Sequence, residues 1–171
     1  SMLTPIIQAL EQVHSLGIIH RDISPDNIMI QPHGSLMLLD LGAAKDIDIQ
    51  KKDGSIQSSR LVAKEGFSPL EQYSSNGRIG TWTDVYSMSA TIYYCCTGKL
   101  PPRATERAGT DSLVCIPPLR EKEFAVLKRG MALNGKDRIQ TMGELLELLQ
   151  ALNEAPQTGG NATKIGAENV P

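Results

Sequence analysis

The chain has 171 residues, of which 40% are hydrophobic, and its formal net charge is −2. A chain of this length can bury one sizeable core, so a single domain is expected. The small negative charge excludes a strongly basic surface, and nothing favours nucleic acid or an anionic membrane as a partner.

Targeting and redox signals are equally sparse. No segment reaches the eighteen or so apolar residues of a membrane span, and the N-terminus lacks the regions of a signal peptide. Cys95 and Cys96 are adjacent and Cys115 stands alone, which is neither a disulfide framework nor a metal spacing. A reducing, cytoplasmic compartment is therefore expected. Residues 1–2 are typical of a tag remnant, which indicates a piece cut from a longer protein.

The N-terminal part of the chain predicts a helix and then a small hairpin. Thr4 is the candidate N-cap, Pro5 takes the first helical position, and Gly17 ends the apolar helical spacing. Residues 27–31 and 35–39 are typical of two short strands, which a Pro-His-Gly turn connects.

The middle of the chain combines a long loop with a buried helix. Residues 43–64 have no hydrophobic period and are rich in charge, serine and glycine, as a surface loop is. Loops of this length inside a compact domain are usually functional or disordered. Residues 83–97 are apolar on nearly every side of a helix, which predicts a central, buried position.

Two helices and a tail complete the chain. Helices are predicted over residues 121–132 and 141–152, the second opened by a capping-box pattern of Thr141 and Glu144. Residues 153–171 are rich in Pro, Gly, Asn and Thr without an apolar period, so they are expected to form a flexible polar tail or linker. The fold class is therefore mainly α.

The residues most informative for chemistry lie around the hairpin. Asn27 ends a polar loop and Asp40 follows the second strand, so their side-chain oxygens are expected to point toward one place. Mg²⁺ prefers such oxygen ligands. Asp22, on the same loop, remains free to accept a proton from an incoming hydroxyl and to orient it for attack. Taken singly, each of these residues is about as well explained as a turn former.

Together these residues resemble the catalytic motifs of the eukaryotic-like (bacterial-type) serine/threonine protein kinases. The H-R-D-x-x-x-x-N pattern is present as His20, Arg21, Asp22 and Asn27, and the D-F-G triplet as Asp40, Leu41 and Gly42. The resemblance implies that Asp22 is the catalytic base and that Asn27 and Asp40 hold Mg²⁺. It also implies that ATP is the phosphoryl donor, with Met29 beneath its adenine.

The resemblance covers about residues 3–152 and implies the fold of a kinase C-terminal lobe, a helical bundle with a small β-hairpin and a long activation segment. The glycine-rich loop and the lysine–glutamate pair of the N-terminal lobe precede the first helix in the family and have no counterpart here. We therefore expect this lobe to be missing, and the isolated chain to be inactive without it in cis. The expected substrate is a protein.

Three further charged residues match structural positions of the family. Glu71, in the segment Phe-Ser-Pro-Leu-Glu-Gln, resembles the glutamate of the A-P-E element, and Arg138 matches its ion-pair partner. Asp84 matches the aspartate that holds the catalytic loop through backbone hydrogen bonds. Each alone is explained as a solvated charge, since most charged residues are exposed, but the appearance of all three in the family's order argues against that explanation.

One departure from the family concerns a cation. The second residue after the catalytic aspartate is usually a lysine that contacts the transferred phosphate, and here it is Ser24. A lysine appears instead in the activation segment, where Ala63 and Lys64 replace the usual Gly-Thr pair. We expect Lys64 to reach the place left at Ser24, and we weigh this against an ordinary solvated lysine.

The sequence also contains candidate regulatory residues and allows two alternative functions. Arg21 is in the family the partner of a phosphorylated activation-segment residue, for which Ser55, Ser58 and Ser59 are candidates. A pseudokinase scaffold is one alternative, favoured by Ser24. A small-molecule kinase of the aminoglycoside or choline type is another, although that class lacks the long activation segment. The tail would also suit a linker to a membrane anchor.

Overall fold

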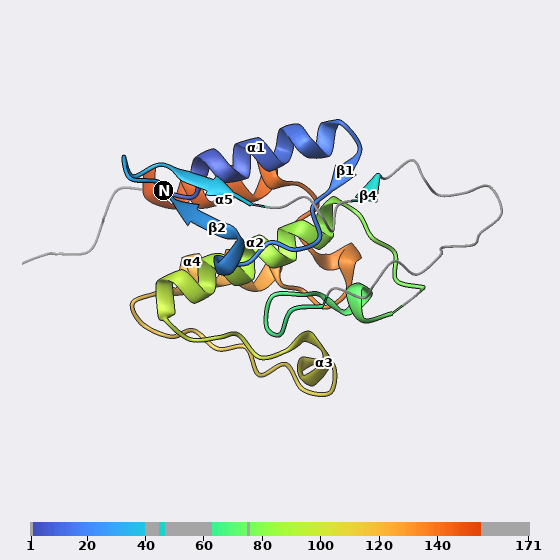
Figure 1. Cartoon of the computed structure of the whole chain (residues 1–171). Helices are drawn as coiled ribbons and strands as arrows, with labels where there is room; N and C mark the ends of the chain where they lie inside the picture. The colour runs from blue at the N-terminus through green and yellow to red at the C-terminus, as the bar shows by residue number, and fades with distance from the viewer. Residues whose placement is uncertain (1, 40–44, 47–62, 75, 155–171) are drawn as a thin grey trace, which may run out of the picture.

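The long helix α2 (Thr81–Thr97) runs through the centre of the molecule (Figure 1). The structure is a computed structural model that describes residues 2–39, 45–46, 63–74 and 76–154. Around α2 pack α1 (Thr4–Ser15), α4 (Glu121–Gly130) and α5 (Met142–Glu154), and α3 (Ala104–Arg107) lies in the segment that connects α2 to α4. The expected mainly helical architecture is confirmed for these residues.

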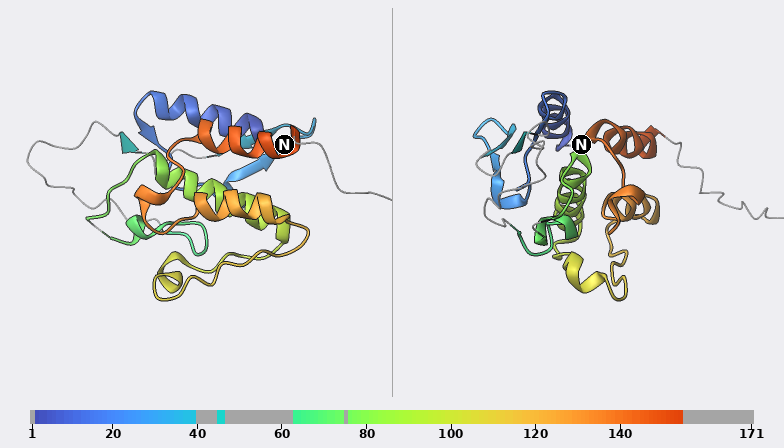
Figure 2. Two further views of the ribbon diagram at one scale, coloured as in Figure 1. Left: turned by 180° about the vertical axis from the view of Figure 1, so that it is seen from behind. Right: turned by 90° about the vertical axis from the view of Figure 1, so that its right-hand side faces the viewer.

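Short strands lie on the other side of α2 from α4 (Figure 2, right). β2 (Ile28–Ile30) pairs antiparallel with β3 (Leu36–Leu38), with Met29 opposite Met37. This is the predicted hairpin, each strand one residue shorter at either end. A second pair, which the sequence analysis missed, joins β1 (Ile18–Ile19) to β4 (Lys45–Asp46).

Two apolar clusters form the core on either side of α2. One lies beneath α1 and α5 and includes Ile7, Leu10, Val85, Met88 and Leu145. The other lies between α2, α4 and the segment that precedes α4, and includes Tyr86, Tyr93, Leu119, Leu127 and Met131. A central helix that faces both clusters must be apolar on several sides, which explains its lack of an amphipathic pattern.

The ends of the helices differ from the predictions in ways that hydrogen bonds explain. Thr4 was predicted as the N-cap but is the first helical residue, because the Leu3 carbonyl already accepts from the Ile7 N–H (3.0 Å). α2 starts two residues early, and the Thr83 hydroxyl accepts from the Gly80 N–H (3.2 Å). α4 ends at Gly130, and α5 runs to Glu154.

Burial of α2 is uneven along its length. Residues from Thr83 to Thr91 are buried, whereas Tyr94, Cys95 and Cys96 near its C-terminus are exposed although their types are apolar. At the buried end Gly130 of α4 lies so close that a Cβ there would be 2.1 Å from the Ser89 hydroxyl oxygen. Only glycine allows this approach of α4 to α2.

Within the described ranges, no helix is long and apolar enough to span a membrane.

Candidate active site

The loop between β1 and β2 carries the predicted catalytic residues in a fixed arrangement. A short 3₁₀ helix (Pro25–Asn27) turns the chain, and the Asn27 amide group donates to the Asp22 carbonyl (2.7 Å) and to the Asp22 Oδ2 (2.9 Å). Only the NH₂ group of Asn27 can make these two bonds, since both partners are acceptors. The amide oxygen Oδ1 of Asn27 is thereby turned away from Asp22.

Asp84, at the buried start of α2, binds the backbone of this loop. Its two carboxylate oxygens accept from the backbone N–H groups of His20 and Arg21, both at 2.8 Å. Arg21 has a φ of 71°, the left-handed conformation that costs a non-glycine residue about 1–3 kcal/mol. The Arg21 N–H donates to Asp84, and the Arg21 carbonyl accepts from the Gln72 side-chain amide (2.6 Å). These two bonds maintain the strained backbone next to Asp22.

The sequence analysis missed two residues that support the loop. His14 Nε2 donates to the Asp84 Oδ2 at 2.8 Å and is buried with it. The spacing of His14 from Leu10 on α1 places it on the buried face, which is a signal that the sequence did contain. Gln72 donates to the Arg21 carbonyl from a different segment, and no sequence pattern indicates this.

The other residues of the H-R-D motif are buried with few partners. His20 is fully buried, and its Nδ1 accepts from the Asp22 N–H at 3.3 Å. Burial lowers the pKa of Arg21, and the nearby Asp84 carboxylate partly offsets this. Within the described part of the chain, the Arg21 Nε is buried without a hydrogen-bond partner.

Lys64 comes close to the catalytic loop from the distant segment that begins at residue 63. Its ammonium donates to the Ser24 hydroxyl at 2.9 Å and forms an ion pair with Asp26 at 2.7 Å. Ser24 is fully buried beneath this contact. The structure thus places Lys64 at Ser24, and the carboxylate that it pairs with is Asp26.

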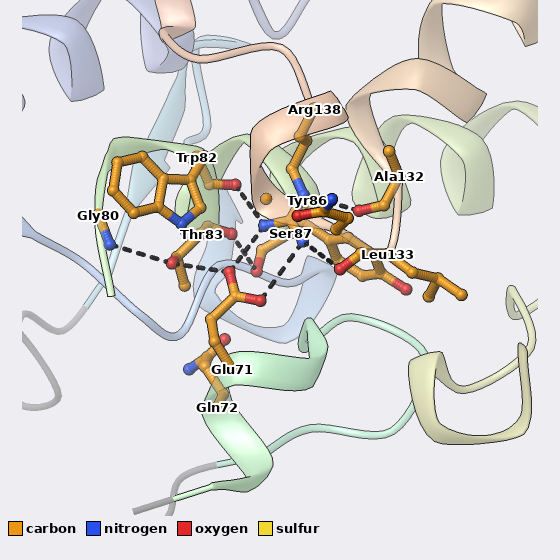
Figure 3. Close-up of polar contacts among 12 residues, drawn as sticks. Glu71, Gln72, Gly80, Trp82, Thr83, Tyr86, Ser87, Ala132, Leu133 and Arg138 are labelled. Carbon is orange, nitrogen blue, oxygen red and sulfur yellow. Dashed lines mark hydrogen bonds and ion pairs between the residues drawn. The ribbon is translucent and has the colours of Figure 1, made fainter. Parts of the chain in front are cut away.

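Glu71 and Arg138, far apart in sequence, lie together beside the start of α2 (Figure 3). The Arg138 guanidinium donates to both Glu71 carboxylate oxygens, at 2.7 and 3.3 Å, and to the carbonyls of Trp82, Ala132 and Leu133. Its side chain is wholly buried and also stacks on the Tyr86 ring, at 5.1 Å from the ring centre. The Thr83 hydroxyl donates at 3.0 Å to Glu71 Oε1, the oxygen that also accepts the 2.7 Å bond from Arg138.

The remaining predicted residues are either on the hairpin or outside the described ranges. Met29 and Met37 are cross-strand neighbours, 42% and 40% exposed, and so present an apolar surface on one face of the hairpin. Asp40, Leu41, Gly42, Ser55, Ser58 and Ser59 lie outside the residues that the structure describes.

Asn27 fits the part of a magnesium ligand. Its NH₂ group is used within the loop, and no described residue donates to its amide oxygen, which is a ligand type suited to a hard cation. Asp22 has one carboxylate oxygen engaged with Asn27 and the other without a partner among the described residues.

Comparison with known proteins identifies relatives of one kind. A model of the protein kinase domain matches residues 1–152. Serine/threonine-protein kinase PknA of Nostoc sp. is 33% identical over 158 residues, which are 87% of this chain and 27% of the relative. Serine/threonine-protein kinase PknH of Mycobacterium bovis is 30% identical over 172 residues, covering 92% of this chain and 28% of the relative.

A third relative, serine/threonine-protein kinase D of Synechocystis sp., is 39% identical over 104 residues, or 59% of this chain and 20% of the relative. The chain thus spans between a fifth and three tenths of the length of these proteins. Because the domain model covers most of the chain, we conclude that it belongs to the protein kinase domain family, with bacterial serine/threonine kinases as relatives.

Proposed function

We propose that this chain carries the catalytic loop and the substrate-facing lobe of a kinase that transfers the γ-phosphoryl group of ATP to a serine or threonine hydroxyl of a protein. The observation that carries the proposal is the fixed pair of Asp22 and Asn27, held by Asp84 through the backbone of the strained loop. The lobe comprises residues 3–154, because α5 includes the first two residues of the tail that the sequence predicted. Its relatives are named as serine/threonine-protein kinases.

Asp22 acts as the base in this proposal. Its free carboxylate oxygen accepts the proton of the substrate hydroxyl, the hydroxyl oxygen attacks the γ-phosphorus, and the bond to the bridging oxygen of ADP breaks. Kinases of this family use ATP and Mg²⁺, and the bound ion neutralises charge on the phosphates. Asn27, through its free amide oxygen, and Asp40 are the proposed ligands.

The adenine of the nucleotide also needs an apolar surface on one side and a second lobe on the other. The exposed face of Met29 and Met37 supplies the floor for the adenine, because flexible thioethers adapt to a flat ring. We propose that an N-terminal lobe in the same polypeptide covers the nucleotide and that activity requires it. Three free thiols and the use of ATP suit a reducing, cytoplasmic compartment.

Arg21 is proposed as a sensor of phosphorylation. It is buried, and its Nε has no partner among the described residues, so a phosphate would supply the missing acceptor. Ser55, Ser58 and Ser59 are the candidate sites. Mass spectrometry of the active full-length protein should find phosphate on at least one of them, and its absence from residues 40–71 would reject the switch.

The proposed function is tested by replacing Asp22 in the full-length protein. Asp22→Asn should lower kcat about 10²–10⁴-fold, the usual contribution of general base catalysis, with little change in the melting temperature. Asp40→Asn should have a comparable effect through the metal. The matched control is Asp137→Asn, an exposed aspartate for which the described residues provide no side-chain partner. Near wild-type phosphorylation of a protein substrate by Asp22→Asn would reject the assignment, and a folded but inactive wild type would favour a scaffold.

A further inference from the structure

We infer that Lys64 is a catalytic residue that contacts the transferred phosphoryl group, delivered to the catalytic loop from the segment that precedes Phe67. This inference rests on the proposed kinase function and adds a residue to it. Among the described residues, Lys64 is the single lysine or arginine whose side chain bonds to any residue of the segment 22–27.

The backbone of Lys64 is fixed on buried neighbours. The Lys64 N–H donates to the Ser68 hydroxyl at 2.8 Å, and its carbonyl accepts from the N–H groups of Phe67 (3.1 Å) and Ser68 (2.9 Å). Phe67 and Ser68 are both buried. The side chain therefore starts from a defined point, which favours a positional role over that of a solvated loop lysine.

The ammonium has capacity left for a ligand. It carries three N–H groups, of which one is directed to Ser24 and one to Asp26. The side chain is 33% exposed, so water or a ligand reaches it, while the buried Ser24 hydroxyl fixes it two residues from Asp22. Its third N–H has no partner within the described ranges.

The Asp26 contact is weak enough to be exchanged. The Asp26 side chain is 76% exposed, and water and salt screen an ion pair of that kind, so it contributes little. A phosphoryl group brings more negative charge than one carboxylate, and in the transition state this charge is spread over its three equatorial oxygens. Lys64 would thus turn from Asp26 to a phosphoryl oxygen while its bond to Ser24 holds.

In the reaction Lys64 neither forms nor breaks a covalent bond. The substrate oxygen forms the new bond to the γ-phosphorus, the bridging oxygen leaves with ADP, and the hydroxyl proton passes to Asp22. Lys64 stabilises the charge on the group in transit. Because Lys64 meets the equatorial oxygens in the geometry of the transition state, the contact raises kcat more than it tightens substrate binding.

Steady-state kinetics on the full-length protein test this role. Lys64→Met, which keeps the apolar stem and removes the charge, should lower kcat by about 10²-fold with little change in KM for the protein substrate. The control is Lys122→Met, since Lys122 is exposed on α4 and makes no side-chain bond to a described residue. A kcat for Lys64→Met equal to that of the control would overturn the inference.

Two further variants separate chemistry from tethering. Ser24→Ala removes the anchor but keeps the cation, so it should lose much less activity than Lys64→Met; equal losses would mean that Lys64 only ties the two segments together. Ser24→Lys combined with Lys64→Thr returns a cation to the loop and should regain at least part of kcat. If this double variant folds but stays as inactive as Lys64→Met, the inference fails.

The outcome for Lys64 is distinguishable from the outcome for the proposed function. An active wild type that Asp22→Asn inactivates, together with an unaffected Lys64→Met, would reject the role of Lys64 alone. A wild type without phosphoryl transfer would reject both. Thermal unfolding of each variant verifies that it is folded.

Discussion

The two charged clusters of this chain, one around Arg138 and one around Asp22, use their polar groups in opposite ways. Arg138 is wholly buried, and its guanidinium makes five hydrogen bonds. Two go to the Glu71 carboxylate oxygens and three go to backbone carbonyls. Around Asp22 an amide oxygen of Asn27, a carboxylate oxygen and an N–H of Lys64 are without partners among the described residues. The polar groups of the first cluster find their partners within the protein, whereas the second cluster has groups left over that can bind a ligand.

Burial explains the difference. A charge removed from water needs partners for all its polar atoms, or its desolvation costs several kcal/mol. Arg138 and Glu71 satisfy this need internally and thereby join the segment before α2 to the loop before α5. Lys64 and Asp26 are partly or largely exposed, so water can satisfy the polar atoms that have no partner in the protein. We therefore expect mutations in the first cluster to affect folding and those in the second to affect turnover.

The largest effect on stability is expected for Glu71→Gln. This change leaves the Arg138 charge buried without its counter-ion, which typically costs about 3–5 kcal/mol. Denaturant unfolding monitored by circular dichroism should show this loss in the free energy of unfolding. The matched control is Glu147→Gln on the exposed face of α5, which should be nearly neutral. Equal stability of the two variants would show that the Arg138 cluster does not stabilise the fold.

An intermediate effect is expected for Asp84→Asn. Asp84 lies on α2, between the two clusters. One N–H of His20 or Arg21 would then face an amide NH₂ group, and losing such a buried hydrogen bond costs about 1–3 kcal/mol. Because Arg21 would lose support for its left-handed backbone next to Asp22, turnover should fall more than stability does. The check is to measure kcat and the unfolding free energy on the same preparation. Unchanged kcat in a destabilised variant would separate Asp84 from the catalytic loop.

The smallest effect is expected at a third pair, Arg107 and Asp111, which is half open. The Arg107 side chain is wholly buried, and Asp111 is 37% exposed. The hydrogen bond from Arg107 lowers the pKa of Asp111, and the Leu113 N–H adds to this against the opposing effect of burial. Asp111→Asn should reduce the free energy of unfolding at neutral pH by about 1 kcal/mol.

The pH dependence of this difference has a definite sign. A carboxyl whose pKa is lower in the folded than in the unfolded state stabilises above its unfolded pKa, and the gain disappears as pH falls through the folded pKa. The difference between wild type and Asp111→Asn should therefore be constant near neutrality, begin to shrink as pH falls below about 4, and vanish only once the pH is below the lowered pKa of Asp111 in the folded state. A difference that persists at lower pH would assign the stabilisation to packing of the side chain.

Local patterns were sufficient for most helices, for the hairpin and for the order of the catalytic motif. They failed at helix ends, where the deciding hydrogen bonds come from single backbone groups, as at Leu3 and Gly80. They also missed β1 with β4, because two-residue strands have no periodicity to detect and depend on partner residues 26 and 28 positions away. The exposed end of α2 shows that apolar composition alone does not define burial.

The sequence by itself determined which residues are available for chemistry and in what order, because spacing along a chain is independent of folding. It placed Asp22 and Asn27 on one turn, and it showed that a lysine was absent at residue 24 and present at residue 64. Only the tertiary structure showed which distant groups meet. His14 and Gln72 reach the loop from separate segments, and nothing in the sequence predicted these contacts with Asp84 and Arg21. The family resemblance led us to expect Arg138 at Glu71, across 67 residues, and Lys64 at Ser24, across 40, but the distances between these groups come from the structure. Such contacts depend on how buried helices pack against one another, and a linear pattern carries no information on the distance between two surfaces that folding brings together.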